Sequence, residues 1–169
     1  MPSPLLVNAT ELLRQPGARR RIEVTVPRAD VGVDDDRLSG DVAVAVDLEP
    51  SLDDIVVKGR LSVAWSDECR RCLRPLSGDL EVEVEERYAL HPEAIDDAFP
   101  ITGGQIDLRP MVREEILLAV PDGPLCRPDC PGLCPVCGAD LQEGPCGCDT
   151  TTRDERWAVL DQLRDDVQP

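Results

Sequence analysis

Eight cysteines fall into four closely spaced pairs, and their spacing is the strongest chemical signal in this sequence. The pairs are Cys69 with Cys72, Cys126 with Cys130, Cys134 with Cys137, and Cys146 with Cys148. Two thiolates separated by two residues can bind one tetrahedral metal ion when the backbone turns tightly between them. In the stretch 133–138, Pro135 presets φ in that turn and Gly138 permits a positive φ just after it. We therefore expect a structural zinc site made of Cys134, Cys137, Cys146 and Cys148.

The other two pairs predict a second zinc site, formed by Cys69, Cys72, Cys126 and Cys130. The first of these pairs lies between two expected strands, where a hairpin turn presents both thiols. Two alternatives stay open: a single zinc ion with spare thiols, or a partition in which Cys126 and Cys130 join the later cysteines. A redox C-x-x-C pair is a further alternative, but that motif usually opens a helix in a βαβ unit. Because four protein ligands would close each site to water, the expected role of zinc is structural and not catalytic.

The composition narrows the class of protein. The chain has 169 residues and a formal net charge of −16, with 41% hydrophobic residues. That hydrophobic content argues against disorder, and the acidity argues against a general binder of nucleic-acid phosphates. The longest apolar run, residues 116–120, is far too short to span a membrane, and the first residues do not resemble a signal peptide. We expect a cytoplasmic protein, where cysteines stay reduced and available to metal.

Other chemically active residue types give weaker signals. Arg70, Arg71 and Arg74 crowd the first cysteine pair and are candidates for contacting RNA phosphate or a partner protein. The alternative is that these arginines pair with local carboxylates. His91, the single histidine, stands in an expected loop, and the alternating glutamates of residues 81–85 predict a solvated strand face. No catalytic constellation emerges, so we expect neither an enzyme nor a small-molecule substrate.

The elements that position these residues follow from hydrophobic periodicity. Alternating apolar residues predict strands over 22–26, 41–48, 54–66 with Gly59 as a bend or bulge, and 80–90. A long loop is expected over 91–106, then a helix over 107–120 capped by Asp107, and a terminal helix over 154–167. Strands without intervening helices favour an α+β fold with an antiparallel, partly barrel-like sheet. The expected domains are a β-rich 1–121, which includes the 107–120 helix, and a zinc-ribbon-like 122–169 with the terminal helix packed on it.

Several of these motifs, taken in order, resemble the YceD family of large ribosomal RNA subunit accumulation proteins. They are Cys69-Arg70-Arg71-Cys72-Leu73, the Asp107-Leu108 helix start, and Gly132-Leu133-Cys134-Pro135-Val136-Cys137-Gly138. The resemblance covers roughly residues 15 to 165. In it, Gln142 stands where many relatives have Asn, a change with little expected consequence for metal binding. Some relatives lack the ribbon cysteines, which implies that the ribbon is a stabilising variation on a common core.

The resemblance implies a non-catalytic factor in the accumulation or processing of large-subunit ribosomal RNA and in ribosome assembly. The charge suggests an acidic adaptor that binds a basic ribosomal protein or a pre-ribosomal ribonucleoprotein, with ribosomal RNA contacted only indirectly. Two rival hypotheses remain. One is direct RNA binding through the arginines of the first cysteine pair and the N-terminal run 19–21, and the other is a thiol-based redox or zinc sensor.

Overall fold

The computed structural model describes residues 3–15, 17–52, 54–95 and 97–149, and it divides the chain into two compact units. The first, here called the sheet unit, comprises Met1–Asp67 and Pro75–Pro124. The second, here called the cysteine unit, comprises Glu68–Arg74 and Leu125–Pro169. The cysteine unit therefore takes in a short segment from the middle of the chain. The domain boundary expected at residue 121 stays a prediction, and the expected helix over 154–167 lies outside the described residues.

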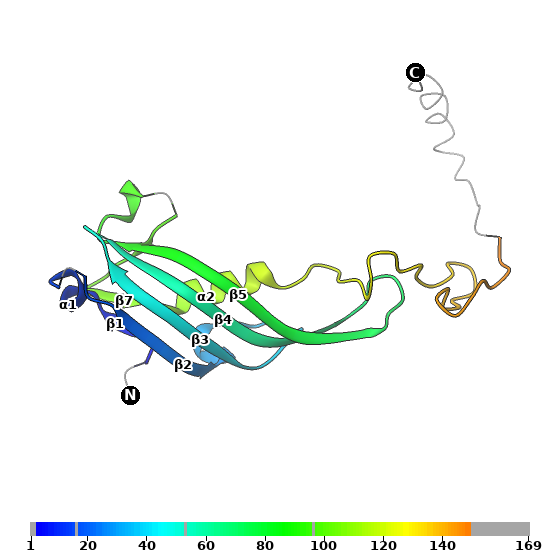
Figure 1. The fold of residues 1–169 in the computed structure, drawn as a ribbon. Coiled ribbons are helices and arrows are strands. Elements are labelled where there is room, and N and C mark those ends of the chain that lie inside the picture. The colour runs from blue at the N-terminus through cyan, green and yellow to red at the C-terminus, as the bar shows by residue number, and fades with distance from the viewer. Residues whose placement is uncertain (1–2, 16, 53, 96, 150–169) are drawn as a thin grey trace, which may run out of the picture. The chain divides into compact units, whose positions relative to one another are not determined.

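A five-stranded sheet forms the body of the sheet unit (Figure 1). Its strands, in spatial order, are β2 (Arg20–Pro27), β3 (Leu38–Pro50), β4 (Asp54–Glu68), β5 (Pro75–Ala89) and β6 (Phe99–Pro100). β2 pairs with β3, and β3 with β4, in antiparallel register. β2, β3 and β4 contain the first three segments expected from hydrophobic alternation, and β5 covers the fourth except for its last residue, Leu90. The alternation arises because one face of each strand is buried and the other is solvated.

The sheet departs from the expected antiparallel, barrel-like arrangement in two ways. β6 pairs with β5 in parallel, so the sheet is mixed, and within the described residues it is open and not a closed barrel. The stretch 91–106 is also more structured than the expected loop. It contains the 3-10 helix η2 (Pro92–Ala94), β6, and the first residues of β7 (Gln105–Asp107). Strands of two or three residues are too short to give a visible alternation.

The described residues of the sheet unit also form a second, two-stranded sheet and two α-helices. β1 (Leu6–Asn8) pairs antiparallel with β7, and α1 (Ala9–Leu13) follows β1 directly with Asn8 as its N-cap. A 3-10 helix, η1 (Arg28–Val31), follows β2, and α2 (Arg109–Ala119) follows β7. None of the helices in the described part of the chain is long and apolar enough to cross a membrane.

The core of the sheet unit lies between the inner face of the sheet and α2. Val44 of β3, Leu61 of β4 and Ile116 of α2 are among its fully buried side chains. α2 begins two residues after the start of the expected helix over 107–120, and its N-cap is Leu108 and not Asp107. Asp107 instead accepts a hydrogen bond from the Arg109 backbone N–H at 3.0 Å and pairs with the Arg109 guanidinium at 2.6 Å.

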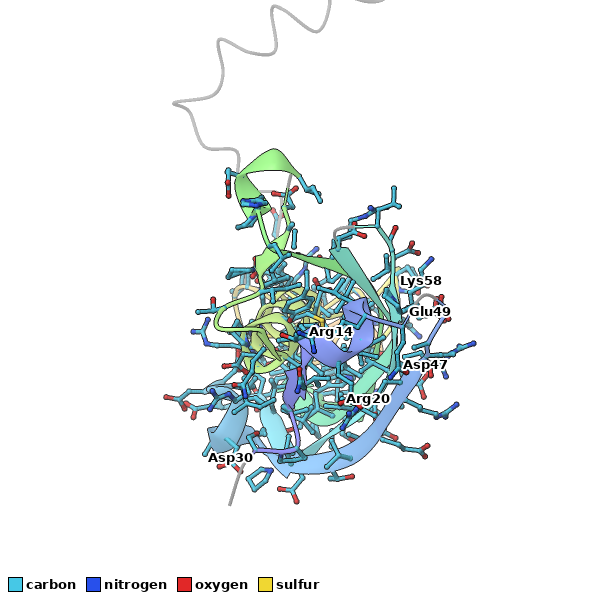
Figure 2. The ribbon with its side chains drawn as sticks, turned by 90° about the vertical axis from the view of Figure 1, so that its left-hand side faces the viewer. Arg14, Arg20, Asp30, Asp47, Glu49 and Lys58 are labelled. Atoms are coloured by element: carbon cyan, nitrogen blue, oxygen red, sulfur yellow. The ribbon has the colours of Figure 1, made fainter. Side chains whose placement is uncertain are left out.

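The outer face of the sheet is charged. Figure 2 shows Asp47 and Glu49 of β3 and Lys58 of β4 on the side away from the helices. Gly59 is not the expected bulge, since it lies directly across from Val46 in continuous register. A Cβ at position 59 would come within 2.2 Å of the Ala45 carbonyl oxygen, so glycine allows the two strands to approach closely. The irregularity in register occurs instead in β3, between Ser39 and Ala43.

Candidate metal centres

The segment Glu68–Arg74 forms a tight turn, here called the knuckle, that connects β4 to β5. The Cys69 N–H donates to the Arg74 carbonyl and the Leu73 N–H donates to the Cys69 carbonyl, both at 2.8 Å. Leu73 adopts a left-handed φ of 58°, which lets the chain reverse within so few residues. The turn holds Cys69 and Cys72 on one loop, as the sequence predicts for a pair separated by two residues.

The segment 130–133 of the cysteine unit docks on the knuckle through Arg71. The Arg71 guanidinium donates to the Cys130 carbonyl at 2.8 Å, and the Leu133 N–H donates to the Arg71 carbonyl at 3.0 Å. Gly132 has φ of +79°, and a Cβ there would lie 2.9 Å from the Arg71 carbonyl oxygen. Glycine is required at position 132 both for its conformation and for this close approach.

This docking gathers four cysteines, here called the knuckle tetrad: Cys69, Cys72, Cys126 and Cys130. Their sulfur atoms all lie within 4.8 Å of one another. The Sγ atoms of Cys69 and Cys130 are 3.8 Å apart, and those of Cys72 and Cys126 are 3.7 Å apart. A disulfide would require about 2.05 Å. Four sulfurs at about 2.3 Å from one tetrahedral zinc ion lie about 3.8 Å from each other, so the donor set fits that ion.

The thiols of the knuckle tetrad are held in contrasting electrostatic environments. Burial raises the pKa of Cys130 to about 12. Burial also acts to raise the pKa of Cys69, but backbone N–H groups of Cys126, Cys72 and Arg71 outweigh it and bring the value to about 6. One thiolate is thus available near neutral pH without metal, and a bound cation would replace the protons on the others.

A second group of four cysteines, here called the ribbon tetrad, forms within a single stretch of chain: Cys134, Cys137, Cys146 and Cys148. The Cys134 N–H donates to the Ala139 carbonyl at 2.8 Å, and the Gly138 N–H donates back to the Cys134 carbonyl at 2.9 Å. Gly138 has φ of +74°, the positive value expected for it. Backbone N–H groups of Cys137 and Val136 lower the pKa of Cys134 to about 6, while hydrogen bonding to Cys137 and Cys146 raises that of Cys148 to about 12.

The two tetrads are the same two groups of cysteines that the spacing predicts, and each could hold one metal ion. They differ in enclosure. Three of the four cysteines of the knuckle tetrad are buried, and Cys126 is half-buried. In the ribbon tetrad only Cys134 is buried, and Cys137 is exposed.

The three arginines of the knuckle have separate roles. Arg71 anchors the Cys130 carbonyl, and Arg74 pairs with Asp140 at 2.7 Å. Arg70 is exposed and forms no hydrogen bond or ion pair within the described part of the chain. Of the N-terminal run, Arg19 pairs with Asp47 at 3.0 Å. Local pairing thus accounts for most of these arginines, and the assignment of any of them to RNA or a partner stays a prediction.

The remaining sequence candidates lie on the surface of the sheet unit. The glutamates of the β5 outer face pair with basic residues of β4, since Lys58 contacts Glu85 and Arg60 contacts Glu81 and Glu83. His91 is exposed in a loop, with Nδ1 3.4 Å from Glu93.

Sequence reasoning missed the contribution of Gln142 to the knuckle tetrad. Its side-chain Nε2 lies 3.8 Å from the Cys126 sulfur and 3.7 Å from the Cys130 sulfur, as a hydrogen-bond donor to both. The Gln142 backbone N–H also donates to the Asp140 carboxylate at 2.9 Å. A glutamine twelve residues beyond the last of these cysteines has no spacing signature, although its place five residues after Cys137 could have suggested a supporting role.

Fold and sites together define an α+β protein with two four-cysteine centres in one compact unit. Residues 57–164 match the family described as large ribosomal RNA subunit accumulation protein YceD, and the chain belongs to this YceD family. All eight cysteines lie inside the matched region.

Several of the relatives found come from mycobacteria. An uncharacterized protein of Mycobacterium tuberculosis is 32% identical over 170 residues, which cover 95% of this chain and 82% of that protein. One from Mycobacterium leprae is 32% identical over 98% of this chain and 80% of its own length. The chloroplastic large ribosomal RNA subunit accumulation protein YCED homolog 1 of Arabidopsis thaliana is 30% identical over 70 residues, 41% of this chain and 22% of that protein. No solved structure matches the chain significantly.

Proposed function

We propose that this protein supports the accumulation of large-subunit ribosomal RNA and ribosome assembly as a zinc-stabilised acidic adaptor that catalyses no reaction itself. Membership of the YceD family carries this proposal, because the family is named for that process. The proposal places the protein in the cytoplasm, where the reducing environment keeps eight free cysteines available to metal.

In this proposal each tetrad holds one structural Zn²⁺ ion. The support is the sulfur spacing of 3.7 and 3.8 Å in the knuckle tetrad and the closed, four-thiol composition of both groups. Zinc at the knuckle tetrad would cross-link the knuckle to the segment that begins at Leu125. The cysteine unit has little hydrophobic core, so its stability would depend on such a cross-link. Each site of four thiolates and one Zn²⁺ adds a net charge of about −2 to an already acidic chain.

The proposed partner is a basic ribosomal protein or a pre-ribosomal ribonucleoprotein. The net charge of −16 supports this choice, because complementary charge speeds encounter and excludes wrong partners. The same charge repels nucleic-acid phosphates, and Arg71 and Arg74 are engaged within the cysteine unit. Ribosomal RNA is therefore contacted through the partner.

Capture of partners from lysate, with and without nuclease, tests the adaptor role. We expect at least one basic ribosomal protein to remain bound after nuclease treatment. Loss of every ribosomal protein after nuclease would overturn direct protein binding. Deletion of the gene should lower large-subunit relative to small-subunit ribosomal RNA, and the intact gene should restore that ratio.

Native mass spectrometry of the purified full chain tests the metal assignment. Two zinc ions per chain are expected. One ion would mean that only one of the tetrads is a zinc site, and no zinc under reducing conditions would overturn the assignment.

The arginines of the knuckle provide a separate test, of direct RNA binding. If RNA were bound directly, Arg70→Glu would weaken that binding and the affinity would fall steeply with salt.

The exposure of Cys137 favours a second candidate function, a thiol-based redox or zinc sensor at the ribbon tetrad. A sensor should release its zinc under a mild oxidant and recover it on reduction, with a matching change in partner binding. Retention of both ions under mild oxidant would exclude this function.

A further inference from the structure

An apolar hollow of about 430 Å³ opens on the surface of the sheet unit, and none of its lining residues is a cysteine. Its walls come from β1, β5, β6, β7 and the first turn of α2. Its lining includes Leu6, Tyr88, Phe99, Pro100, Thr102 and Gln105. A hollow of this size can enclose one large apolar side chain of a bound peptide.

The aromatic wall of this hollow is rigid. The rings of Tyr88 and Phe99 stack with centroids 5.2 Å apart and planes at 23°. Tyr88 is buried, and its hydroxyl donates to the Asp107 backbone carbonyl at 3.1 Å. Phe99 is only half-buried and lines the hollow, and the buried Tyr88 ring holds it in place from the other side. A preformed wall reduces the ordering that a ligand must impose on binding.

A second hollow of about 320 Å³ adjoins the first, because Phe99 and Pro100 line both. Its remaining lining is mainly acidic: Glu86, Asp97, Glu114 and Glu115. Glu86 lies on β5, and Glu114 and Glu115 lie on α2. We name the two hollows together the β5–α2 groove. It is apolar at one end and negatively charged at the other.

The acidic end of the groove has no basic counterpart among the described residues. Arg87, next to Glu86 in sequence, pairs with Asp54, and no described lysine or arginine forms an ion pair with Glu86, Glu114 or Glu115. Partial burial, and then the charge of Glu115, raise the pKa of Glu86. At the apolar end the carboxylate of Asp107 is already paired with Arg109. The carboxylates without a cation therefore gather at one end only.

We infer that the β5–α2 groove binds an extended basic peptide segment of a partner protein, with an apolar side chain in the first hollow and a lysine or arginine beside Glu86, Glu114 and Glu115. Charge complementarity selects this occupant, since a phosphate backbone would be repelled by the same carboxylates. The inference rests on the proposed function in that it supplies the surface through which an acidic adaptor recognises a basic protein.

Two labelled nonapeptides test the inference against the full chain by fluorescence anisotropy. Both contain the same five lysines and arginines, and their central residue is phenylalanine in one and glycine in the other. The phenylalanine peptide should bind at least about tenfold more tightly, because only it fills the apolar hollow. Equal binding of the two peptides would overturn the inference.

A pair of matched double variants tests whether the basic side chain of the peptide binds at the acidic end of the groove. Glu114→Gln with Glu115→Gln removes two charges from the groove, and Glu81→Gln with Glu83→Gln removes two from the exposed face of β5. The groove variant should weaken the phenylalanine peptide about tenfold and the control variant less than twofold. Equal weakening would mean that only net charge matters and would overturn the site. Circular dichroism should show the groove variant folded, since it relieves repulsion among carboxylates.

The same variants separate this inference from the proposed function. If nuclease-treated capture retains a basic ribosomal protein equally with the parent and the groove variant, the adaptor role stands and the groove assignment fails. If the peptides bind the groove as expected but no ribosomal protein is retained, the groove stands and the proposed partner is wrong.

Discussion

The two tetrads have the same four ligand types but differ in how the chain assembles them. The knuckle tetrad joins sulfurs that are 61 residues apart between Cys69 and Cys130, and both of these side chains are at most 1% exposed. The ribbon tetrad closes within the single stretch 134–148, and Cys137 is exposed. A cross-link between distant segments removes more freedom from the unfolded chain than a local one. The knuckle tetrad should therefore contribute more to the stability of the cysteine unit than the ribbon tetrad does.

The largest effect is expected from removing one ligand of each tetrad in turn. Cys72→Ser should abolish metal binding at the knuckle tetrad and remove a large part of the roughly 10 kcal/mol that a structural zinc site contributes. Cys137→Ser should also remove one ion but unfold only the local ribbon. Native mass spectrometry gives the zinc count, and hydrogen exchange at Glu68–Arg74 reports the loss of structure.

The comparison would fail if both variants exposed the knuckle amides to the same extent. Serine is a close match in size to cysteine, so steric damage does not explain a difference between the variants. Any contrast in hydrogen exchange then reflects the position of the lost ligand in the chain.

The order of metal loss should follow the order of enclosure. Under excess chelator, the ribbon tetrad should release its ion first, and Cys137 should then be alkylated before any cysteine of the knuckle tetrad. An opening of the knuckle that costs about 3 kcal/mol would slow its reaction by about a hundredfold relative to the exposed site. Mass spectrometry of the alkylated peptides measures this order, and simultaneous labelling of both tetrads would contradict it.

Alternating strands and paired cysteines could be predicted from sequence because both are local patterns. Val42, Val44 and Val46 repeat every second residue, and each is buried in β3 as this periodicity requires. The two cysteines of each pair are likewise close in sequence, so each pair can be recognised directly. Only a few ways of combining the four pairs into metal sites then had to be considered.

Features that depend on distant segments could not be predicted in this way. The parallel pairing of Phe99 with Tyr88 involves a two-residue strand with no periodicity of its own. The open edge of the sheet depends on strand curvature, which hydrophobic alternation does not encode. Gln142 reaches Cys126 across sixteen residues, and a lone amide near a metal site has no sequence signature. The β5–α2 groove could not be predicted from the sequence either, because its lining residues come from five elements that are separate along the chain.

Gln142 offers a test specific to the knuckle tetrad. Gln142→Leu keeps the size of the side chain and the backbone N–H that donates to Asp140, but removes the amide donor to the Cys126 and Cys130 sulfurs. Groups that support metal ligands from outside typically change affinity by 10- to 100-fold, and we expect the lower end of that range for contacts of 3.7 and 3.8 Å. Competition with a zinc indicator should resolve a weaker knuckle site and an unchanged ribbon site. Equal weakening at both would mean that Gln142 acts on the whole unit.

The smallest effect is expected at the ion pair that connects the two regions, between Arg74 of the knuckle and Asp140 beside the ribbon. The Gln142 backbone N–H and the Arg74 guanidinium hold the pKa of the Asp140 carboxyl below its ordinary value of 3.8, against the opposing effect of burial. A carboxyl whose pKa is lowered on folding contributes stability above its unfolded pKa and loses it as the pH falls through the folded value. The stability difference between the parent and Asp140→Asn should thus be constant from pH 7 to about pH 5 and shrink below about pH 4, near the unfolded pKa. Urea unfolding of both proteins measures this difference at the pH values where native mass spectrometry shows that both retain their zinc. A difference that grew on acidification would show that Asp140 acts by some means other than its charge.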